Sequence, residues 1–300
     1  MGAHRFPFRA MAADNEVQVH GDEELAVRAA GAAIAEVLRI EARYSRYRPE
    51  SVVSRINAAA GSSVGIDAET RGLLAYADAC FLQSGGLFDA TSGVLRRAWR
   101  FDEGRVPDDA EIAPLLRLIG WGRVDLGEAS VRLPDRGMEL DFGGFGKEYA
   151  VDRAAAVLRG AGVQSALVNL AGDVMILGPQ PDGSAWRVGI RHPRRDGELV
   201  ATLPVSSGAL ATSGDYERFT EVNGVRHCHV LDPRTGRSAR GFQSVTVHAQ
   251  SCLVAGSAST IAMLKGRDGG LAWLRDLGLA HFCVLEDGSI VDAFGPHDTA

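Results

Sequence analysis

A glycine-rich turn between an apolar run and a lysine is the feature that most constrains how this chain can fold. Residues 138–147 are MELDFGGFGK: an apolar run that predicts a strand ending in Asp141, three glycines, and Lys147 opening a helical pattern over residues 149–158. Glycine lets a backbone approach a ligand closely, and the amides of a helix start favour an anion. Such turns also serve as plain connections between elements, so the pattern alone leaves open a phosphate site or a structural turn.

Composition and charge exclude several classes of function. The 300 residues are 46% hydrophobic and 23% charged, which is ordinary for a globular enzyme, and the formal net charge is -6. An acidic chain lacks the general basic face that nucleic acid or anionic lipid requires. Four widely spaced cysteines form no CxxC pair, so we expect neither a disulfide framework nor a zinc site.

The sequence predicts no targeting or membrane segment. The first nine residues lack the apolar region of a signal peptide, and no apolar run is long enough to span a bilayer. As written, the chain is expected to be cytoplasmic, or periplasmic if an export signal has been removed.

Hydrophobic periodicity predicts an α+β fold with mixed or antiparallel sheets and packed helices, because helices and short strands do not alternate strictly. Helices are expected over residues 23–43, 51–59, 69–84, 109–118, 252–264 and 269–277. Strands are expected over residues 16–20, 165–169, 174–177, 186–191, 199–205, 227–231, 244–247, 281–285 and 289–291, with a small hairpin around 126–129. We expect one domain over residues 1–300, with a boundary near 100–137 if it divides into subdomains.

Four polar clusters stand apart from the apolar frame, at residues 169–173, 211–216, 229–236 and 255–260. Asn, Asp, Gly and Pro are the usual turn residues, and Ser or Thr often caps a helix, so each cluster alone favours a turn or a helix start. His229 at a predicted strand end, with Asp232 three residues on, could act as a general base or donate to a phosphate, or could simply be hydrogen-bonded in a turn. Lys147 could neutralise diphosphate charge or simply extend to solvent from the helix start, and the neighbouring glycines favour the first interpretation.

Taken in order, these clusters resemble the ApbE family of flavin transferases, which attach FMN from FAD to a threonine of a target protein. The matching segments run through nearly the whole chain: Met11, Tyr47-Arg-Pro-Glu-Ser51 with Asn57, Phe88-Asp-Ala-Thr91, Asp141 to Lys147, Tyr149-Ala-Val-Asp152, Asn169 to Asp173, Ala211 to Tyr216 and His229 to Gly236.

The resemblance implies an ApbE-like, T-fold-like architecture with FAD as substrate and Mg²⁺ near its diphosphate. The implied FAD-binding residues are Met11, Tyr47, Leu87, Phe88, Asp89, Asp141, Gly143, Lys147 and Val230, with His229 as the catalytic residue. The implied reaction is phosphoryl transfer to an acceptor threonine with release of AMP. The expected partners are therefore FAD and a protein bearing that threonine; the sequence sets no oligomeric state.

Departures from the family pattern fall on functional positions. The family has Ala-Asp-Ala-Leu-Ala-Thr where this chain has AGSAST over residues 255–260, so Gly256 replaces the carboxylate expected to hold Mg²⁺. Thr260 and the Gly146 carbonyl remain as neutral metal ligands. Glu148 stands where the family has glycine, and could substitute for the lost carboxylate or face solvent at the helix start. Ala171 replaces the first glycine of Asn-x-Gly-Gly-Asp, and the Gly-Thr that follows Met11 in the family is absent.

These departures keep other functions open. Loss of the metal carboxylate at position 256 would suit an FAD-binding accessory or carrier protein without transferase activity. An FAD pyrophosphatase, in which water replaces the threonine, is a further alternative. A dinucleotide oxidoreductase has little support, because residues 143–146 do not fit GxGxxG.

Overall fold

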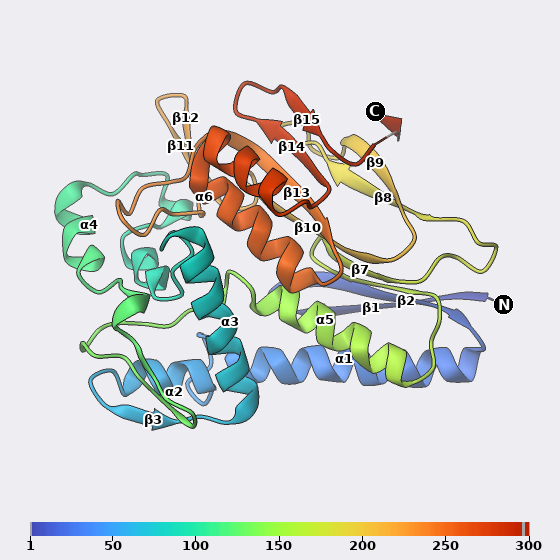
Figure 1. The fold of residues 1–300 in the computed structure, drawn as a ribbon, viewed down its shortest axis with the longest axis horizontal. Helices are drawn as coiled ribbons and strands as arrows, with labels where there is room; N and C mark the ends of the chain where they lie inside the picture. The colour runs from blue at the N-terminus through green and yellow to red at the C-terminus, as the bar shows by residue number, and fades with distance from the viewer. Residues whose placement is uncertain (1, 296–297, 300) are drawn as a thin grey trace.

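The computed structural model describes residues 2–295 and 298–299 and is built on an eight-stranded antiparallel sheet (Figure 1). The α+β prediction is confirmed. In spatial order the strands are β1 (Gly2–Ala10), β2 (Ala13–Gly21), β6 (Ala166–Leu170), β7 (Asp173–Leu177), β10 (Gly208–Gly214), β13 (Phe242–Ala249), β14 (His281–Leu285) and β15 (Ile290–Asp292).

Three long helices cover one face of this sheet: α1 (Glu23–Tyr44), α5 (Gly146–Gly160) and α6 (Cys252–Asp276). Their buried side chains, many of them alanine on α1 and α5, join the inward residues of the strands in one large apolar core. Small side chains let the helices approach each other and the sheet closely. A second apolar cluster joins the opposite face to a small sheet of β8 (Trp186–Arg191), β9 (Leu199–Val205) and β16 (Asp298–Thr299).

The shorter elements lie mostly on the left of Figure 1, beside the ends of α1 and α5. They are α2 (Val52–Ala58), β3 (Ser63–Gly65), α3 (Ala68–Ser84), α4 (Asp109–Leu116), β4 (Asp125–Leu126), β5 (Ser130–Arg132), and 3₁₀ turns at Ser92–Arg97, Phe101–Glu103 and Trp121–Arg123. The hairpin of β11 (Phe219–Val222) and β12 (Val225–Cys228) lies at the top. The subdomain boundary near residues 100–137 stays a prediction.

Local signals place several helix ends where the sequence predicts them. The Ser51 hydroxyl accepts from the Ser54 amide at the start of α2, and Gly85 ends α3 in the left-handed conformation. Asp108 and Glu111 form a capping box on α4. Because these signals need only neighbouring residues, the sequence is sufficient to locate them.

Three hairpins turn through two residues that both have positive φ. Met11 and Ala12 (φ 53° and 61°) join β1 to β2, and Ala171 and Gly172 (φ 52° and 95°) join β6 to β7. The third, in β11–β12, uses Asn-Gly at residues 223–224. The first two are less usual, because alanine rarely adopts this conformation. Since β2 pairs with β6 next to both turns, they lie at the same end of the sheet.

The structure corrects four local predictions. Residues 138–141 form no strand: the Asn57 side chain bonds both the amide and the carbonyl of Leu140, and the Asp141 amide donates to Ala90. The cluster at 211–216 is mostly strand β10 rather than a turn. The strand expected over 227–231 ends at Cys228. Residues 255–260 lie inside α6 rather than at a turn or a helix start. The helices expected over 252–264 and 269–277 are both present as parts of α6, with the non-helical residue Gly266 between them.

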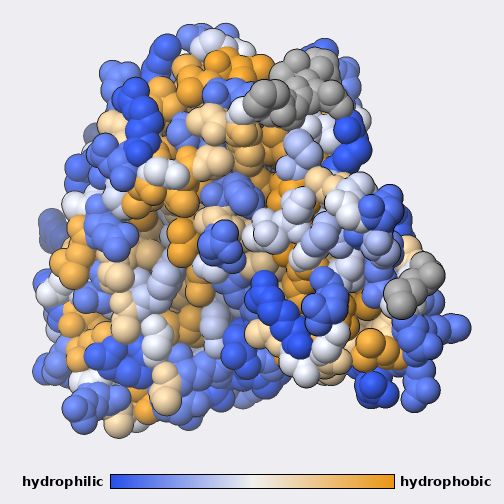
Figure 2. Space-filling view, turned by 45° about the vertical axis from the view of Figure 1, so that its right-hand side comes forward, coloured by the Kyte–Doolittle hydropathy of each residue, from blue (hydrophilic) through white to orange (hydrophobic). Residues whose placement is uncertain are grey.

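Among the described residues, no helix is long and apolar enough to cross a membrane. On the face shown in Figure 2, hydrophilic and hydrophobic residues are interspersed.

Candidate functional site

An ion pair connects the first turn of α5 to the start of the central strand β7. Lys147, in the first turn of α5, places its Nζ 2.8 Å from Oδ2 of Asp173, the first residue of β7. The Asp173 side chain is almost fully buried, and it also accepts from the Thr212 amide on β10. Three elements that are separate in sequence therefore converge beside the glycine turn.

Lys147 remains charged in this setting although protein surrounds it. Burial opposes the charge, but the carboxylates of Asp173 and Glu148 outweigh it and raise the pKa of Lys147 above its usual range. Its side chain nevertheless keeps about a third of its surface accessible, at 34%. A group that is both surrounded and accessible lies in a concave part of the surface, where an anion can reach it.

The glycines of the turn make room for the protein's own side chains. A Cβ on Gly144 would lie 3.1 Å from the Phe88 ring, and one on Gly143 would lie 3.1 Å from Oδ1 of Asp141 and 3.2 Å from Arg46 Nη1. Gly146 begins α5, and a Cβ on it would lie 3.4 Å from Cβ of Phe142. Close packing inside the protein therefore accounts for part of the need for glycine in this turn.

Tyr47 stands out as an exposed aromatic residue next to this turn. Its relative exposure is 75%, whereas most aromatic side chains of the chain are buried or half-buried. The Arg46 guanidinium lies over the ring at 4.8 Å and donates to the hydroxyl at 2.8 Å. Arg46 also pairs with Asp141, whose other oxygen accepts from the Gly143 amide. These contacts hold an accessible ring beside the glycines.

The loop at residues 87–93 packs beneath the same turn. Leu87 and Phe88 are buried, and the Phe88 ring lies 6.3 Å from that of Phe145 between ring centroids. Asp89 is also buried, and its carboxylate accepts from the Thr91 amide and hydroxyl and from the Trp121 amide. The side chain of Asp89 therefore fixes the loop, which is a structural role that the sequence did not suggest.

His229 follows β12 directly and is a candidate proton acceptor. The residue is exposed although protein atoms surround its imidazole on most sides, so it too lies in a concave setting. Burial, and then the positive charges of Arg218 and Lys147, lower its pKa and favour the neutral form. The carboxylate of Asp232, three residues on, accepts from the Arg234 guanidinium. The neighbouring Val230 is buried.

Met11 is positioned by the β1–β2 turn, of which it is the first residue. Its amide donates to Glu41 Oε1 on α1 at 2.7 Å, and its side chain is half-buried against the core. The turn lies beside that of residues 171–172, where the Asn169 side chain accepts from the Gly172 amide. Met11 is therefore at the same end of the sheet as Asp173.

The predicted metal ligands gather where α5 crosses α6. Glu148 is buried and packs against Gly256, and burial, followed by the charge of Asp173, raises its pKa. Thr260 lies one helical turn after Gly256 on the same face of α6. Its hydroxyl is 2.8 Å from that of Ser213. Among the described residues, no group of three or more His, Cys, Asp or Glu side chains is arranged around a metal position.

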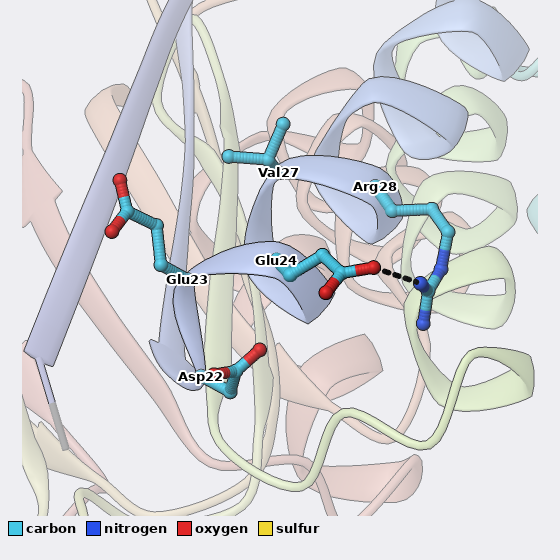
Figure 3. Close-up of a pocket in the computed structure, with 5 residues that line it drawn as sticks. All are labelled: Asp22, Glu23, Glu24, Val27 and Arg28. Atoms are coloured by element: carbon cyan, nitrogen blue, oxygen red, sulfur yellow. Dashed lines mark ion pairs between the residues drawn. The ribbon is translucent and has the colours of Figure 1, made fainter.

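Two surface hollows lie elsewhere. One, of about 540 Å³, is shallow and lies at the start of α1 (Figure 3). It is lined by Asp22, Glu23, Glu24, Val27 and Arg28, with a Glu24–Arg28 ion pair at 3.6 Å. Acidic residues at this helix start stabilise α1 through its dipole, and they indicate no catalytic or binding role. A second, of about 410 Å³, lies between the β11–β12 hairpin and residues 239–242 and contains none of the predicted site residues.

Sequence reasoning missed two contributors to the site. Arg46 adjoins a matched motif, and its charge next to an aromatic residue was the available signal. Ser213 belongs to the 211–216 cluster, which was expected to be a turn. Because it lies instead on strand β10, its hydroxyl contacts the Ser259 hydroxyl on α6. The sequence indicates Asp173 only as part of the polar cluster at residues 169–173.

The chain is similar to proteins of one known family. The model of the ApbE family matches residues 11–283. A Rhodobacter capsulatus protein named FAD:protein FMN transferase is 32% identical over 284 residues, covering 92% of this chain and 54% of that relative. A relative of the same name from Klebsiella pneumoniae (strain 342) is 36% identical over 235 residues, covering 76% of this chain and 72% of the relative.

Solved structures show the same fold. The ApbE protein of Thermotoga maritima superposes with a TM-score of 0.90 at 31% identity, covering 97% of both chains. The flavinyl transferase ApbE of Pseudomonas stutzeri, in its apo form, has a TM-score of 0.87 at 29% identity and covers 99% of this chain and 98% of its own. The chain thus matches solved relatives end to end, but spans only about half of the Rhodobacter relative.

Proposed function

This chain belongs to the ApbE family, and from that premise we propose that it is an FAD:protein FMN transferase. It moves the FMN part of FAD to a threonine hydroxyl of a partner protein and releases AMP. The two relatives named above carry that activity in their names.

One observation carries the proposal: an accessible aromatic ring is held near Gly143, and an accessible ammonium follows Gly146 in the chain. Tyr47 provides the ring, whose flat face suits stacking on a flavin or adenine ring. Lys147 provides the charge, which suits a diphosphate. FAD carries both features, so a dinucleotide bound across the turn would use both groups.

The chemistry assigned to the site is a displacement at phosphorus. The acceptor threonine oxygen forms a bond to the FMN-side phosphorus while the anhydride bond to the AMP phosphate breaks. His229 takes the threonine proton, a role for which its neutral imidazole is suited. Lys147 balances negative charge on the phosphate oxygens, and AMP leaves with the bridging oxygen.

The residues present fit a magnesium ion as well. Among the described residues, one buried carboxylate oxygen of Glu148 has no hydrogen-bond partner. The Thr260 hydroxyl and the Gly146 carbonyl would be the neutral oxygen ligands, of the kind that Mg²⁺ prefers. When bound, the ion would neutralise charge on the diphosphate.

The same observation weakens the case for an accessory protein without transferase activity. That alternative rested on the missing carboxylate at position 256, and a carboxylate from α5 is present against that position. FAD pyrophosphatase activity remains a distinct outcome, since it would release AMP without any acceptor.

The proposal is tested by intact-mass spectrometry of a panel of flavoprotein domains incubated with the chain, FAD and Mg²⁺. We expect one domain to gain the mass of an FMN group, and to lose that gain when its acceptor threonine is changed to alanine. AMP release with no mass gain on any domain would point to hydrolysis. Absence of both products, with FAD bound, would reject the enzymatic proposal.

A further inference from the structure

Glu148 and Gly256 occupy complementary positions on two different helices. A Cβ built on Gly256 would lie 2.6 Å from Cγ and 2.7 Å from Oε1 of Glu148. Side-chain atoms do not approach this closely in proteins, so the glutamate fills the space that a side chain at position 256 would need. The two residues therefore depend on each other: Glu148 can lie here because residue 256 is glycine.

The Glu148 carboxylate is buried without full compensation. Glu148 is only 8% exposed, and its Oε2 atom has no hydrogen-bond partner among the described residues. The positive charge of Lys147 acts on Glu148, but its Nζ is already paired with Asp173 at 2.8 Å. A buried carboxylate oxygen without a partner is costly, and a bound cation is one way to remove that cost.

Hydroxyl groups of α6 and β10 form a linked set close to Gly256 along α6. Thr260 follows Gly256 by one turn, and the hydroxyls of Thr260, Ser213 and Ser259 are linked through Ser213 at 2.8 Å each. Among the described residues, no group of three or more His, Cys, Asp or Glu side chains converges here. One carboxylate together with neutral oxygens suits a hard divalent ion that keeps several waters or phosphate oxygens.

We propose that Glu148, from the first turn of α5, is the anionic ligand of a divalent cation at this crossing, and that glycine at position 256 is required to admit it. The carboxylate thus reaches the metal position from α5 rather than from α6. The proposal rests on the proposed function for one point only, that FAD phosphates supply further oxygens to the ion.

The test is a Mn²⁺ titration of the purified full chain followed by electron paramagnetic resonance of the free ion, with and without FAD. Glu148→Gln keeps the size of the side chain and removes the charge. We expect it to weaken Mn²⁺ binding at least tenfold in whichever state of the wild type binds the ion. Glu128→Gln, an exposed carboxylate on a distant loop, should leave binding unchanged.

A swap of the two positions provides a second arm. Gly256→Asp alone should lower the melting temperature, because the new side chain meets Glu148. The double variant Glu148→Gly/Gly256→Asp returns a carboxylate to the same space from the other helix, and should bind Mn²⁺ within a few-fold of wild type. Mn²⁺ should also raise the melting temperature of the wild type but not that of Glu148→Gln.

Two outcomes would overturn the proposal: a wild-type chain that binds no Mn²⁺ with or without FAD, or Glu148→Gln binding it as well as wild type. FAD binding is measured separately by flavin fluorescence in metal-free buffer. A chain that binds Mn²⁺ through Glu148 but not FAD would contradict the proposed function and leave this inference standing.

Discussion

Lys147 Nζ lies 2.8 Å from Oδ2 of Asp173, and this pair joins the first turn of α5 to the first residue of β7. The aspartate is almost fully buried, whereas the lysine reaches the surface. The ammonium therefore serves both the fold, by compensating a buried carboxylate, and the site, by presenting positive charge to an anion.

Removing only one partner of this pair should be worse than removing both. We expect Lys147→Met to lower the free energy of unfolding by about 1–3 kcal/mol, because it leaves the Asp173 carboxylate buried and unpaired. Asp173→Asn in the same background should recover part of the loss. Denaturant titration of the single and double variants measures the coupling; additive losses would show that the pair does not act as a unit.

Tyr47 should contribute to FAD binding and little to stability, because its ring is 75% exposed. Tyr47→Ala should weaken FAD binding by about 1 kcal/mol or more, the scale of aromatic stacking on a base. Tyr47→Phe should stay near wild type, and Leu82→Ala, an exposed apolar residue on α3, is the control. Flavin fluorescence titration measures the affinity for FAD. If Tyr47→Ala binds FAD as tightly as wild type, the Tyr47 ring is not part of the FAD site.

His229 should affect turnover more than substrate binding. His229→Gln is expected to slow FMN transfer about 100-fold or more by removing the proton acceptor, with FAD affinity nearly unchanged. Because the pKa of His229 is lowered, the neutral form persists as the pH falls below 6.5, and wild-type activity should decline only under more acidic conditions. A pH–rate profile that is unchanged in His229→Gln would contradict this role.

The turns at residues 11–12 and 171–172 hold alanine in a conformation that favours glycine. Ala12→Gly and Ala171→Gly should each raise the free energy of unfolding by up to about 1 kcal/mol, because relief of left-handed strain exceeds the entropy that glycine adds to the unfolded chain. Ala13→Gly, in the adjoining strand β2, should lower it by about 0.5–1 kcal/mol. Thermal unfolding of the three variants would show whether glycine stabilises the protein at the positions with positive φ and destabilises it at Ala13.

Acid should weaken the contact between α1 and α5 through Glu36. Arg39 and Arg153 bond its carboxylate at 2.8 and 3.1 Å and lower its pKa to about 2, with the Arg39 hydrogen bond the largest cause. A lowered folded-state pKa gives stability that is complete above the ordinary value of 4.5 and is lost as the pH falls toward 2. The difference in melting temperature between wild type and Glu36→Gln should therefore be constant at neutral pH and shrink below pH 4.5. A difference that persists at pH 2.5 would exclude this origin.

The sequence located most elements and failed where hydrogen bonds come from distant segments. Residues 138–141 (MELD) alternate apolar and acidic residues as a strand does, but Asn57 and Ala90 supply their hydrogen-bond partners in place of a neighbouring strand. The edge strand β1 was not predicted at all, because its charged and aromatic residues disguise the alternation that its pairing with β2 makes plain. Hydrophobic periodicity shows which residues are apolar. It does not show which backbone groups will form hydrogen bonds with each other.

By itself the sequence determined the α+β class, the helix caps and the ordered motifs that place the chain in its family, because each depends on residues close together in the chain. It also showed that a carboxylate is absent at position 256. Only the tertiary structure decided that Glu148 points inward into the space left by Gly256 rather than toward solvent. That outcome depends on how closely α5 and α6 cross, and helix packing is set by the whole core rather than by either segment.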